Sequence, residues 1–111
     1  MYLAFLSAQD ITGTWAGELS FTDQMGQAQK LTVKFNISAT DDGYTSTLDS
    51  PDQNTFGIAV DTTIFEKPEL TIKAIDLNLE YVGNVVDDTN IKGTLTQHGQ
   101  SFEMDLKKET E

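Results

Sequence analysis

Hydrophobic and polar residues alternate with a period of two along most of this chain. In residues 31–37 every odd position is apolar, and every even position is threonine, lysine or asparagine. Because successive side chains of a β-strand point to opposite faces, this segment predicts a strand with one buried and one solvated face. No long stretch has a helical period, so the chain is predicted to be all-β. The same alternation recurs in residues 15–21, 44–49, 56–61, 70–74, 77–81, 91–95 and 102–106.

Short turn sequences separate these segments. The sequence Asp-Asp-Gly at 41–43 suits a hairpin turn because glycine adopts positive φ without strain, and Pro51 fixes φ in the next turn. Turns at intervals of about eight to twelve residues predict an antiparallel up-and-down meander of about eight or nine short strands. Such a sheet must cover one apolar face. The short connections favour a lipocalin-like barrel, and a two-sheet β-sandwich is the alternative.

Several glycines interrupt otherwise regular strand segments. Glycine within a strand marks a bulge, a bend or a close approach of backbone, and a small curved sheet needs such positions. We expect these features at Gly17, Gly57, Gly83 and Gly93.

The length of 111 residues suits one domain, which we place at residues 10–108. Residues 2–8 form an apolar run that ends in Leu-Ser-Ala and is followed by polar residues, as at the end of a signal peptide. Residues 1–9 are therefore interpreted as a signal-peptide remnant, with a disordered tail as the alternative. Residues 109–111 are predicted to be a charged tail. The interpretation places the protein outside the cytoplasm, in the periplasm or extracellular space of a bacterium.

Charge and cysteine content exclude several classes of function. The net charge is −11, from 18 acidic residues against 7 lysines, and such a chain repels nucleic-acid backbones and anionic membranes. The apolar run at 2–8 is too short to cross a bilayer, which takes about 20 residues. The absence of cysteine excludes disulfides and thiolate chemistry. We expect no nucleic-acid partner and no integral membrane segment.

Residue patterns that would support catalysis are missing from the sequence. The single histidine, His98, lies in a predicted turn, and no Gly-x-Ser-x-Gly motif accompanies it. The paired carboxylates are adjacent in turns, so they cannot face each other across a cleft as glycoside hydrolysis requires. Residues 87–90 lack the spacing of a calcium loop. We therefore predict a protein that is not an enzyme and has no metal or cofactor.

The aromatic residues form the remaining candidate site. Strand faces usually bury such residues as core, but a small barrel can also enclose one apolar ligand. On this second interpretation Trp15 closes one end of the barrel and the aromatic side chains line its interior. The candidate ligand-binding residues are Trp15, Phe35, Tyr44, Phe56, Tyr81 and Phe102.

The chain resembles a domain that precedes the catalytic domain of secreted bacterial α/β-hydrolases and esterases. Residues 10–19 contain Gly-x-Trp-x-Gly-x-Leu, residues 48–53 read Leu-Asp-Ser-Pro-Asp-Gln, and residues 57–60 read Gly-Ile-Ala-Val. Residues 91–99 match Ile-x-Gly-Thr-x-x-Gln-x-Gly, and the resemblance extends over residues 10–108. It implies a non-catalytic accessory or binding module of an exported protein, with a hydrolase domain as neighbour in a longer chain.

A shorter motif is similar to lipocalin-like barrels. In those proteins a Gly-x-Trp motif on the first strand places a tryptophan at the closed base, where a basic residue from a late strand stacks on it. Gly13 and Trp15 match the motif, and Lys107 or Lys108 would supply the basic group, since the chain has no arginine. This similarity implies the alternative function, a free-standing carrier of a small apolar ligand.

Overall fold

The computed structural model describes residues 11–109, so the interpretation of residues 1–9 lies outside the described part of the chain. These residues form ten strands and two single-turn 3-10 helices, η2 (Pro51–Gln53) and η3 (Ile75–Leu77). The prediction of an all-β domain is confirmed, with ten strands in place of eight or nine. The strands are β1 (Gly13–Thr22), β2 (Ala28–Thr40), β3 (Gly43–Ser50), β4 (Thr55–Ala59), β5 (Thr62–Glu66), β6 (Glu69–Ala74), β7 (Leu79–Asp87), β8 (Asn90–Gln97), β9 (Gln100–Glu103) and β10 (Leu106–Lys108).

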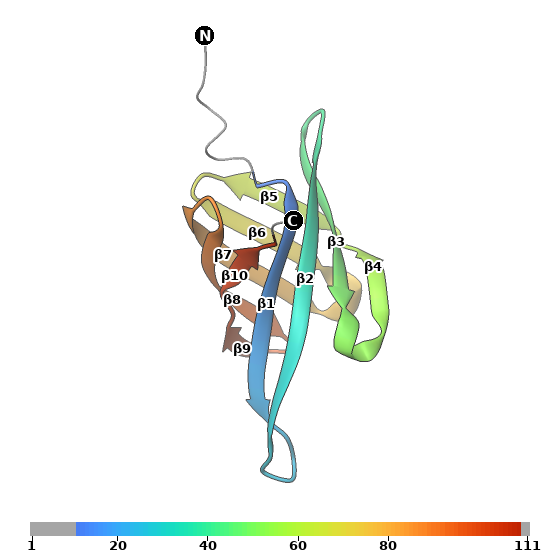
Figure 1. The fold of residues 1–111 in the computed structure, drawn as a ribbon. Coiled ribbons are helices and arrows are strands. Elements are labelled where there is room, and N and C mark those ends of the chain that lie inside the picture. The colour runs from blue at the N-terminus through green and yellow to red at the C-terminus, as the bar shows by residue number, and fades with distance from the viewer. Residues whose placement is uncertain (1–10, 110–111) are drawn as a thin grey trace.

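The strands form two antiparallel meanders, β1 to β4 and β5 to β9, which β10 joins into one sheet (Figure 1). The order in the sheet is β4-β3-β2-β1-β10-β8-β7-β6-β5, and β9 pairs with β8. Strands β9 and β10 pair with successive parts of β8 and are separated by Met104 and Asp105. β10 also pairs with β1, so the first and last strands of the fold lie side by side.

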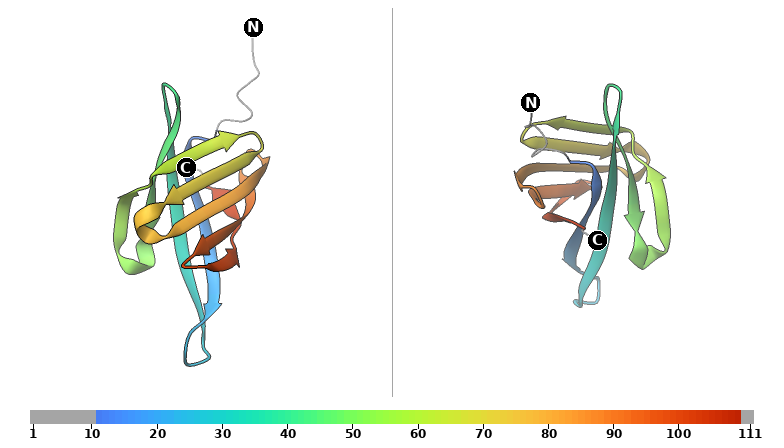
Figure 2. Two further views of the ribbon diagram at one scale, coloured as in Figure 1. Left: turned by 180° about the vertical axis from the view of Figure 1, so that it is seen from behind. Right: turned by 45° about the horizontal axis from the view of Figure 1, so that its top comes forward.

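The sheet is not closed into a barrel, contrary to the expected closure. Strand β4 pairs with β3 and strand β5 pairs with β6, but no ladder joins the two ends of the sheet. The chain changes partner at Val60 and Asp61: the Val60 amide donates to the Ser46 carbonyl, and the Asp61 amide donates to the Lys73 carbonyl. Figure 2 shows β5, β6 and β7 crossing over β1, β2 and β3, an arrangement that fits the sandwich-like alternative.

The alternating pattern of the sequence places one continuous core between the two layers. Along β2, for example, Val33, Phe35 and Ile37 are buried, while the residues between them are only partly covered. The core joins residues from the first half of the chain to residues from the second half. The largest fully buried side chains are Trp15, Tyr81, Phe35, Ile11, Leu70, Ile72, Ile91, Leu95, Met104 and Leu106.

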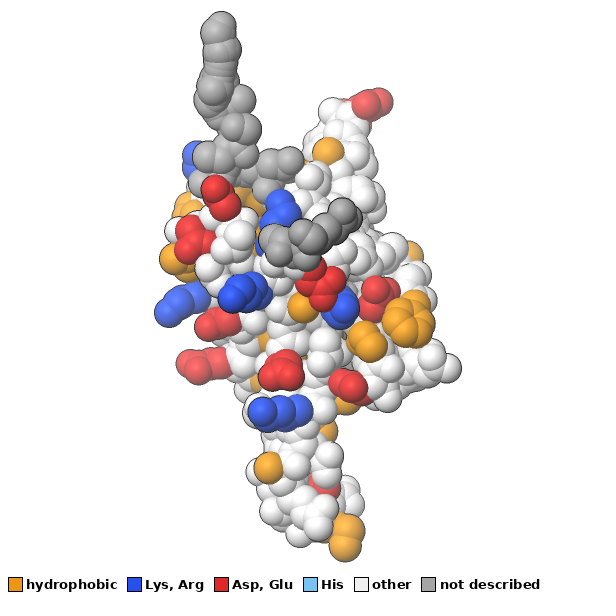
Figure 3. Space-filling view, in the orientation of Figure 1, with side chains coloured by type: hydrophobic (Ala, Val, Ile, Leu, Met, Phe, Trp, Pro, Cys, Tyr) orange, Lys and Arg blue, Asp and Glu red, His pale blue; other side chains and the backbone are white. Residues whose placement is uncertain are grey.

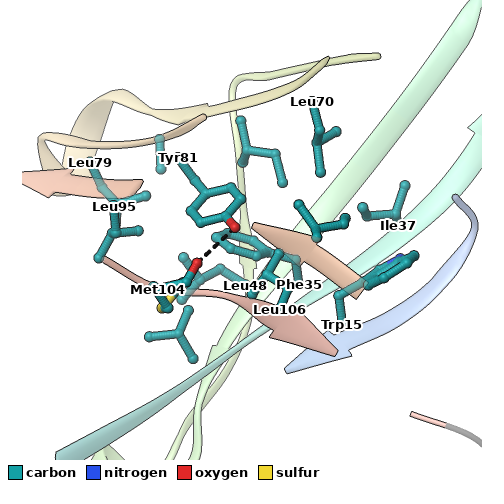
Figure 4. Packing of buried hydrophobic residues seen from close by; sticks show 14 of the residues in the cluster. Trp15, Phe35, Ile37, Leu48, Leu70, Leu79, Tyr81, Leu95, Met104 and Leu106 are labelled. Atoms are coloured by element: carbon teal, nitrogen blue, oxygen red, sulfur yellow. Dashed lines mark hydrogen bonds between the residues drawn. The ribbon is translucent and has the colours of Figure 1, made fainter. Parts of the chain in front are cut away.

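Tyr81 lies at the centre of this core (Figure 4) and packs against two of the strand glycines. A Cβ atom at Gly93 would lie 2.4 Å from the Tyr81 hydroxyl oxygen, and one at Gly83 would lie 2.9 Å from it. The Tyr81 hydroxyl donates a hydrogen bond of 2.8 Å to the Met104 carbonyl. Burial raises the pKa of Tyr81 far above its usual value, with the charge of Asp105 adding to the effect. The expected close approaches at Gly83 and Gly93 are confirmed.

Trp15 is buried and fixed by two contacts. Its indole nitrogen donates a hydrogen bond of 2.9 Å to the Ile11 carbonyl, and the ammonium of Lys108 lies 5.7 Å from the ring centroid. This distance is within the range of a cation–π interaction. Gly13 leaves the space for this lysine, because a Cβ atom there would lie 2.9 Å from Lys108 Cε. We call this region, built around Ile11, Trp15 and Lys108, the closed end.

The hydrogen bonding of the domain continues one residue past the predicted boundary at 108. The Glu109 amide donates to the Thr14 carbonyl at 2.8 Å, and its carboxylate forms an ion pair of 2.8 Å with Lys34. Glu109 is therefore joined to β1 through its backbone and to β2 through its side chain.

The hairpin of β1 and β2 projects beyond the body as an arm (Figure 1). At its tip the Asp23 carboxylate accepts hydrogen bonds from the amides of Met25 and Gln27 and from the side chain of Gln29. The backbone bond from Gln27 and the side-chain bond from Gln29 lower the pKa of Asp23. The carboxylate thus fixes the turn in its ionised form.

Candidate ligand-binding site

A cavity of about 140 Å³ reaches from the surface into the core, away from the closed end. Trp15 does not line it, and Figure 4 shows Leu79 and Leu95 on the opposite side of the cluster from Trp15. Both layers of the fold contribute to the lining, which is mostly leucine, valine and isoleucine. We call this cavity the mouth, and it is lined by Leu19, Leu31, Val33, Leu48, Ser50, Gln53, Ile58, Leu77, Leu79, Leu95 and Gln97.

The two 3-10 turns bring residues of both layers to the mouth. Pro51 begins η2, and Asn54 ends it in the left-handed conformation with φ of 54°. Asn78 ends η3 in the same way, with φ of 52°. Asparagine tolerates this conformation better than most residues, so each chain segment can reverse sharply after one turn. These reversals place Gln53 and Leu77 in the lining.

Three uncharged polar side chains share the lining with the hydrocarbon groups. The Ser50 hydroxyl donates 2.8 Å to Gln53 Oε1, and Gln97 Nε2 donates 3.1 Å to the Leu77 carbonyl. Within residues 11–109, no protein group forms a hydrogen bond with Gln53 Nε2 or Gln97 Oε1. The mouth therefore offers one donor group and one acceptor to another molecule, as a pocket with a few polar groups does.

A second hollow of about 210 Å³ adjoins the mouth at the base of the arm. The two share Leu19, Leu31 and Gln97, so they form one apolar surface that runs outward from the core. The other residues that line this outer hollow are Phe21, His98, Gln100 and Phe102.

His98 lies at the rim of the outer hollow, in the turn between β8 and β9, as predicted. It has φ of 51°, and its amide donates to the Asn78 carbonyl at 3.1 Å. Its Nδ1 lies 3.4 Å from the Asn78 side-chain amide. These contacts join the turn between β8 and β9 to η3, so within the described residues the histidine contributes to turn structure.

The aromatic residues predicted to bind a ligand have different environments. Trp15, Phe35 and Tyr81 are fully buried and do not line the mouth, and Phe35 and Tyr81 pack with ring centroids 5.6 Å apart. Tyr44 is half-buried, 6.1 Å from the ring of Phe65. Phe102 is half-buried and lines the outer hollow.

The predicted interior position of Phe56 is wrong, since 61% of this residue is exposed. The pairing of β3 with β4 shifts register between Leu48 and Ser50, so β4 holds one more residue than β3 at this point. Gly57 lies in this bulge with φ of 70° and donates its amide to the Asp49 carboxylate. A bulge reverses the direction of the preceding side chain, which turns Phe56 outward and leaves Ile58 in the lining.

The sequence pattern does not distinguish the residues that line the mouth from the other core positions. Leu19, Val33, Leu79 and Leu95 carry the same alternating signal as every other core position. The mouth differs from the rest of the core because the side chains of Ser50, Gln53 and Gln97 lie beside these apolar residues. That proximity depends on the tertiary fold. The segment Leu-Asp-Ser-Pro-Asp-Gln contains Ser50 and Gln53, and was the available signal for this part of the site.

The acidic turn at 87–90 forms its own hydrogen bonds. Asp87 Oδ1 accepts from the Thr89 amide and from Asn90 Nδ2, each at 2.9 Å. The backbone bond from Thr89, with a smaller effect from Asn90, lowers the pKa of Asp87. Among residues 11–109, no three histidine, aspartate or glutamate side chains are grouped closely enough to hold a metal ion.

The chain was compared with protein families, curated proteins and solved structures. No family model, curated protein or solved structure matches this chain. In the part of the chain that the structure describes, neither helix has the length or apolar character needed to span a membrane.

Proposed function

We propose that the protein is a non-catalytic binding module that takes a small apolar ligand into the mouth. The observation that carries the proposal is the cavity of about 140 Å³ at the edge of the core, lined by hydrocarbon side chains and three uncharged polar ones. An apolar cavity of about 150 Å³ is large enough for benzene, so the mouth can accept an alkyl or aryl group of about six carbons. Burying about five methylene groups at about 0.8 kcal/mol each would give a dissociation constant on the order of 1 mM.

The contacts at the closed end support the similarity to lipocalin-like carriers. A basic residue from a late strand was expected against Trp15, and Lys108 occupies that position. The pairing of β1 with β10 brings these residues together, since Trp15 lies opposite Lys108. A fold held firmly at one end can leave the other end available for a ligand.

The resemblance to the hydrolase-associated domain supports a second aspect of the proposal. A binding module of an exported bacterial protein would act beside a catalytic domain, and the mouth would then collect an apolar part of that enzyme's substrate. A coding sequence that continues into a Gly-x-Ser-x-Gly domain would support this role. A gene that encodes a signal peptide and this domain alone would favour the free carrier.

A titration with 1-hexanol, followed by methyl NMR, tests ligand binding. Saturable shifts are expected for the methyl groups of Leu19, Leu48 and Leu95, which line the mouth. The methyl groups of Ile37 and Ile72 serve as internal controls, because these buried residues do not line it. Linear shifts without saturation, or equal shifts in both sets, would rule the binding site out.

A further inference from the structure

We infer that the mouth selects neutral amphiphiles, with a short hydrocarbon part and a head group that both donates and accepts hydrogen bonds, and that it rejects carboxylates. The inference rests on the proposed function and names the ligand class for the same site. It follows from the charge and hydrogen-bonding capacity of the lining.

The first observation is the absence of charge in the binding surface. Neither the mouth nor the outer hollow is lined by a lysine, aspartate or glutamate, and His98 is the single titratable side chain among their lining residues. A carboxylate inside would therefore lose hydration without gaining a cationic partner, which is costly in an apolar site. The lining therefore lacks the cationic side chain that would pair with the carboxylate of a fatty acid.

Three lysines contact groups outside the lining. Lys34 pairs with Glu109, Lys73 lies 3.8 Å from Glu80, and Lys108 covers Trp15. On the face shown in Figure 3, acidic and basic side chains are interspersed over the body, so no basic patch gathers there. The net charge of −11 further disfavours approach of an anion at low ionic strength.

The second observation is the pair of amide groups left without a protein partner. Gln53 Nε2 can donate and Gln97 Oε1 can accept, within the hydrogen-bonding described for residues 11–109. A primary amide or an alcohol can serve both groups, because each carries a donor and an acceptor. A carboxylate carries acceptors alone and would leave the Gln97 oxygen facing negative charge. An ammonium group carries donors alone.

A matched pair of ligands tests the selectivity. Hexanamide and hexanoate have the same number of heavy atoms and differ in charge and in donor capacity. In methyl NMR titrations at neutral pH, the dissociation constant of hexanoate is expected to be at least about tenfold higher than that of hexanamide, reflecting the uncompensated desolvation of the carboxylate. Equal or tighter binding of hexanoate would overturn the inference and leave the proposed function intact. Failure of hexanol, hexanamide and hexanoate alike would refute the proposed function itself.

A charge introduced at the mouth provides a second test of the selectivity. Gln53 is exposed on η2, so Gln53→Lys should fold, and it is expected to lower the dissociation constant of hexanoate by at least about fivefold, as a partly desolvated ion pair would. Thr40→Lys is the matched control, because it adds the same charge at an exposed position at the other end of the β2–β3 hairpin from η2. Equal gains in the two variants, or no gain in Gln53→Lys, would overturn the assignment of Gln53 to the head-group position.

Discussion

The closed end and the mouth are both built from antiparallel strands, but they differ in how their polar side chains form hydrogen bonds. At the closed end each aromatic polar group has a backbone acceptor: Trp15 donates to Ile11, and Tyr81 donates to Met104 in the adjoining core. At the mouth the amides of Gln53 and Gln97 each keep one group without a partner among residues 11–109. The polar groups of Trp15 and Tyr81 are buried, so pairing within the protein is needed to avoid a cost in stability. Gln53 is exposed and Gln97 is half-buried, so their free amide groups can bind water and can exchange that water for a ligand.

The largest effect should come from removing the aromatic anchor of the closed end. Trp15→Ala is expected to lower the free energy of unfolding by about 3–5 kcal/mol, because it opens a large cavity in a fully packed region. Urea denaturation followed by circular dichroism measures this difference. A loss below about 1 kcal/mol, as at an exposed position, would contradict the distinction between the two ends.

A smaller effect is expected from crowding the centre of the core. Gly93→Ala places a methyl group 2.4 Å from the Tyr81 hydroxyl oxygen and 2.6 Å from the Val82 carbonyl oxygen. Overpacking of this kind costs about 1–3 kcal/mol or more, since the neighbouring backbone cannot move freely. Thr94→Ala, at the exposed neighbouring position, should change thermal stability far less. Similar melting temperatures for both variants would show that Tyr81 can move aside.

At the mouth, added volume should be tolerated. Leu77→Phe inserts a ring beside the cavity of about 140 Å³ and is expected to change stability by less than about 1 kcal/mol. The same ring should weaken hexanol binding by at least about tenfold, by filling the space that the ligand needs. Ile75→Phe is the control, because 71% of Ile75 is exposed on the same turn. Undiminished binding in Leu77→Phe would place the ligand elsewhere.

The smallest expected effect is a pH-dependent change in the turn at the tip of the arm. The pKa of Asp23 is lowered from 3.8 in the folded state, so its contribution to the turn is present above pH 3.8 and is lost as the pH falls through the lower folded value. NMR shifts of the Met25 and Gln27 amides should follow that titration while core methyl shifts stay constant. Asp23→Asn, which cannot titrate, should abolish the pH dependence. Simultaneous loss of core shifts in the wild type would mean that the arm and core unfold together.

The sequence predicted the strands and the meander because burial on one face leaves a period of two in every strand. It did not predict the opening of the sheet, because the exchange of partners at Val60 and Asp61 changes no hydrophobic pattern. The outward position of Phe56 depends on the bulge at Gly57. A glycine within a strand segment indicates a bulge or a bend, but it does not indicate which way the neighbouring side chain turns. The mouth depends on how side chains from both layers fill a shared volume, which a periodic pattern does not encode.

The position of Trp15 has a consequence for spectroscopy. It is the single tryptophan of the chain, and it is buried at the closed end without lining either hollow. Its fluorescence should therefore report unfolding with little interference from an occupied mouth. Chemical denaturation with and without ligand can then be followed through the same optical signal, and binding energy can be obtained from the displacement of the transition midpoint.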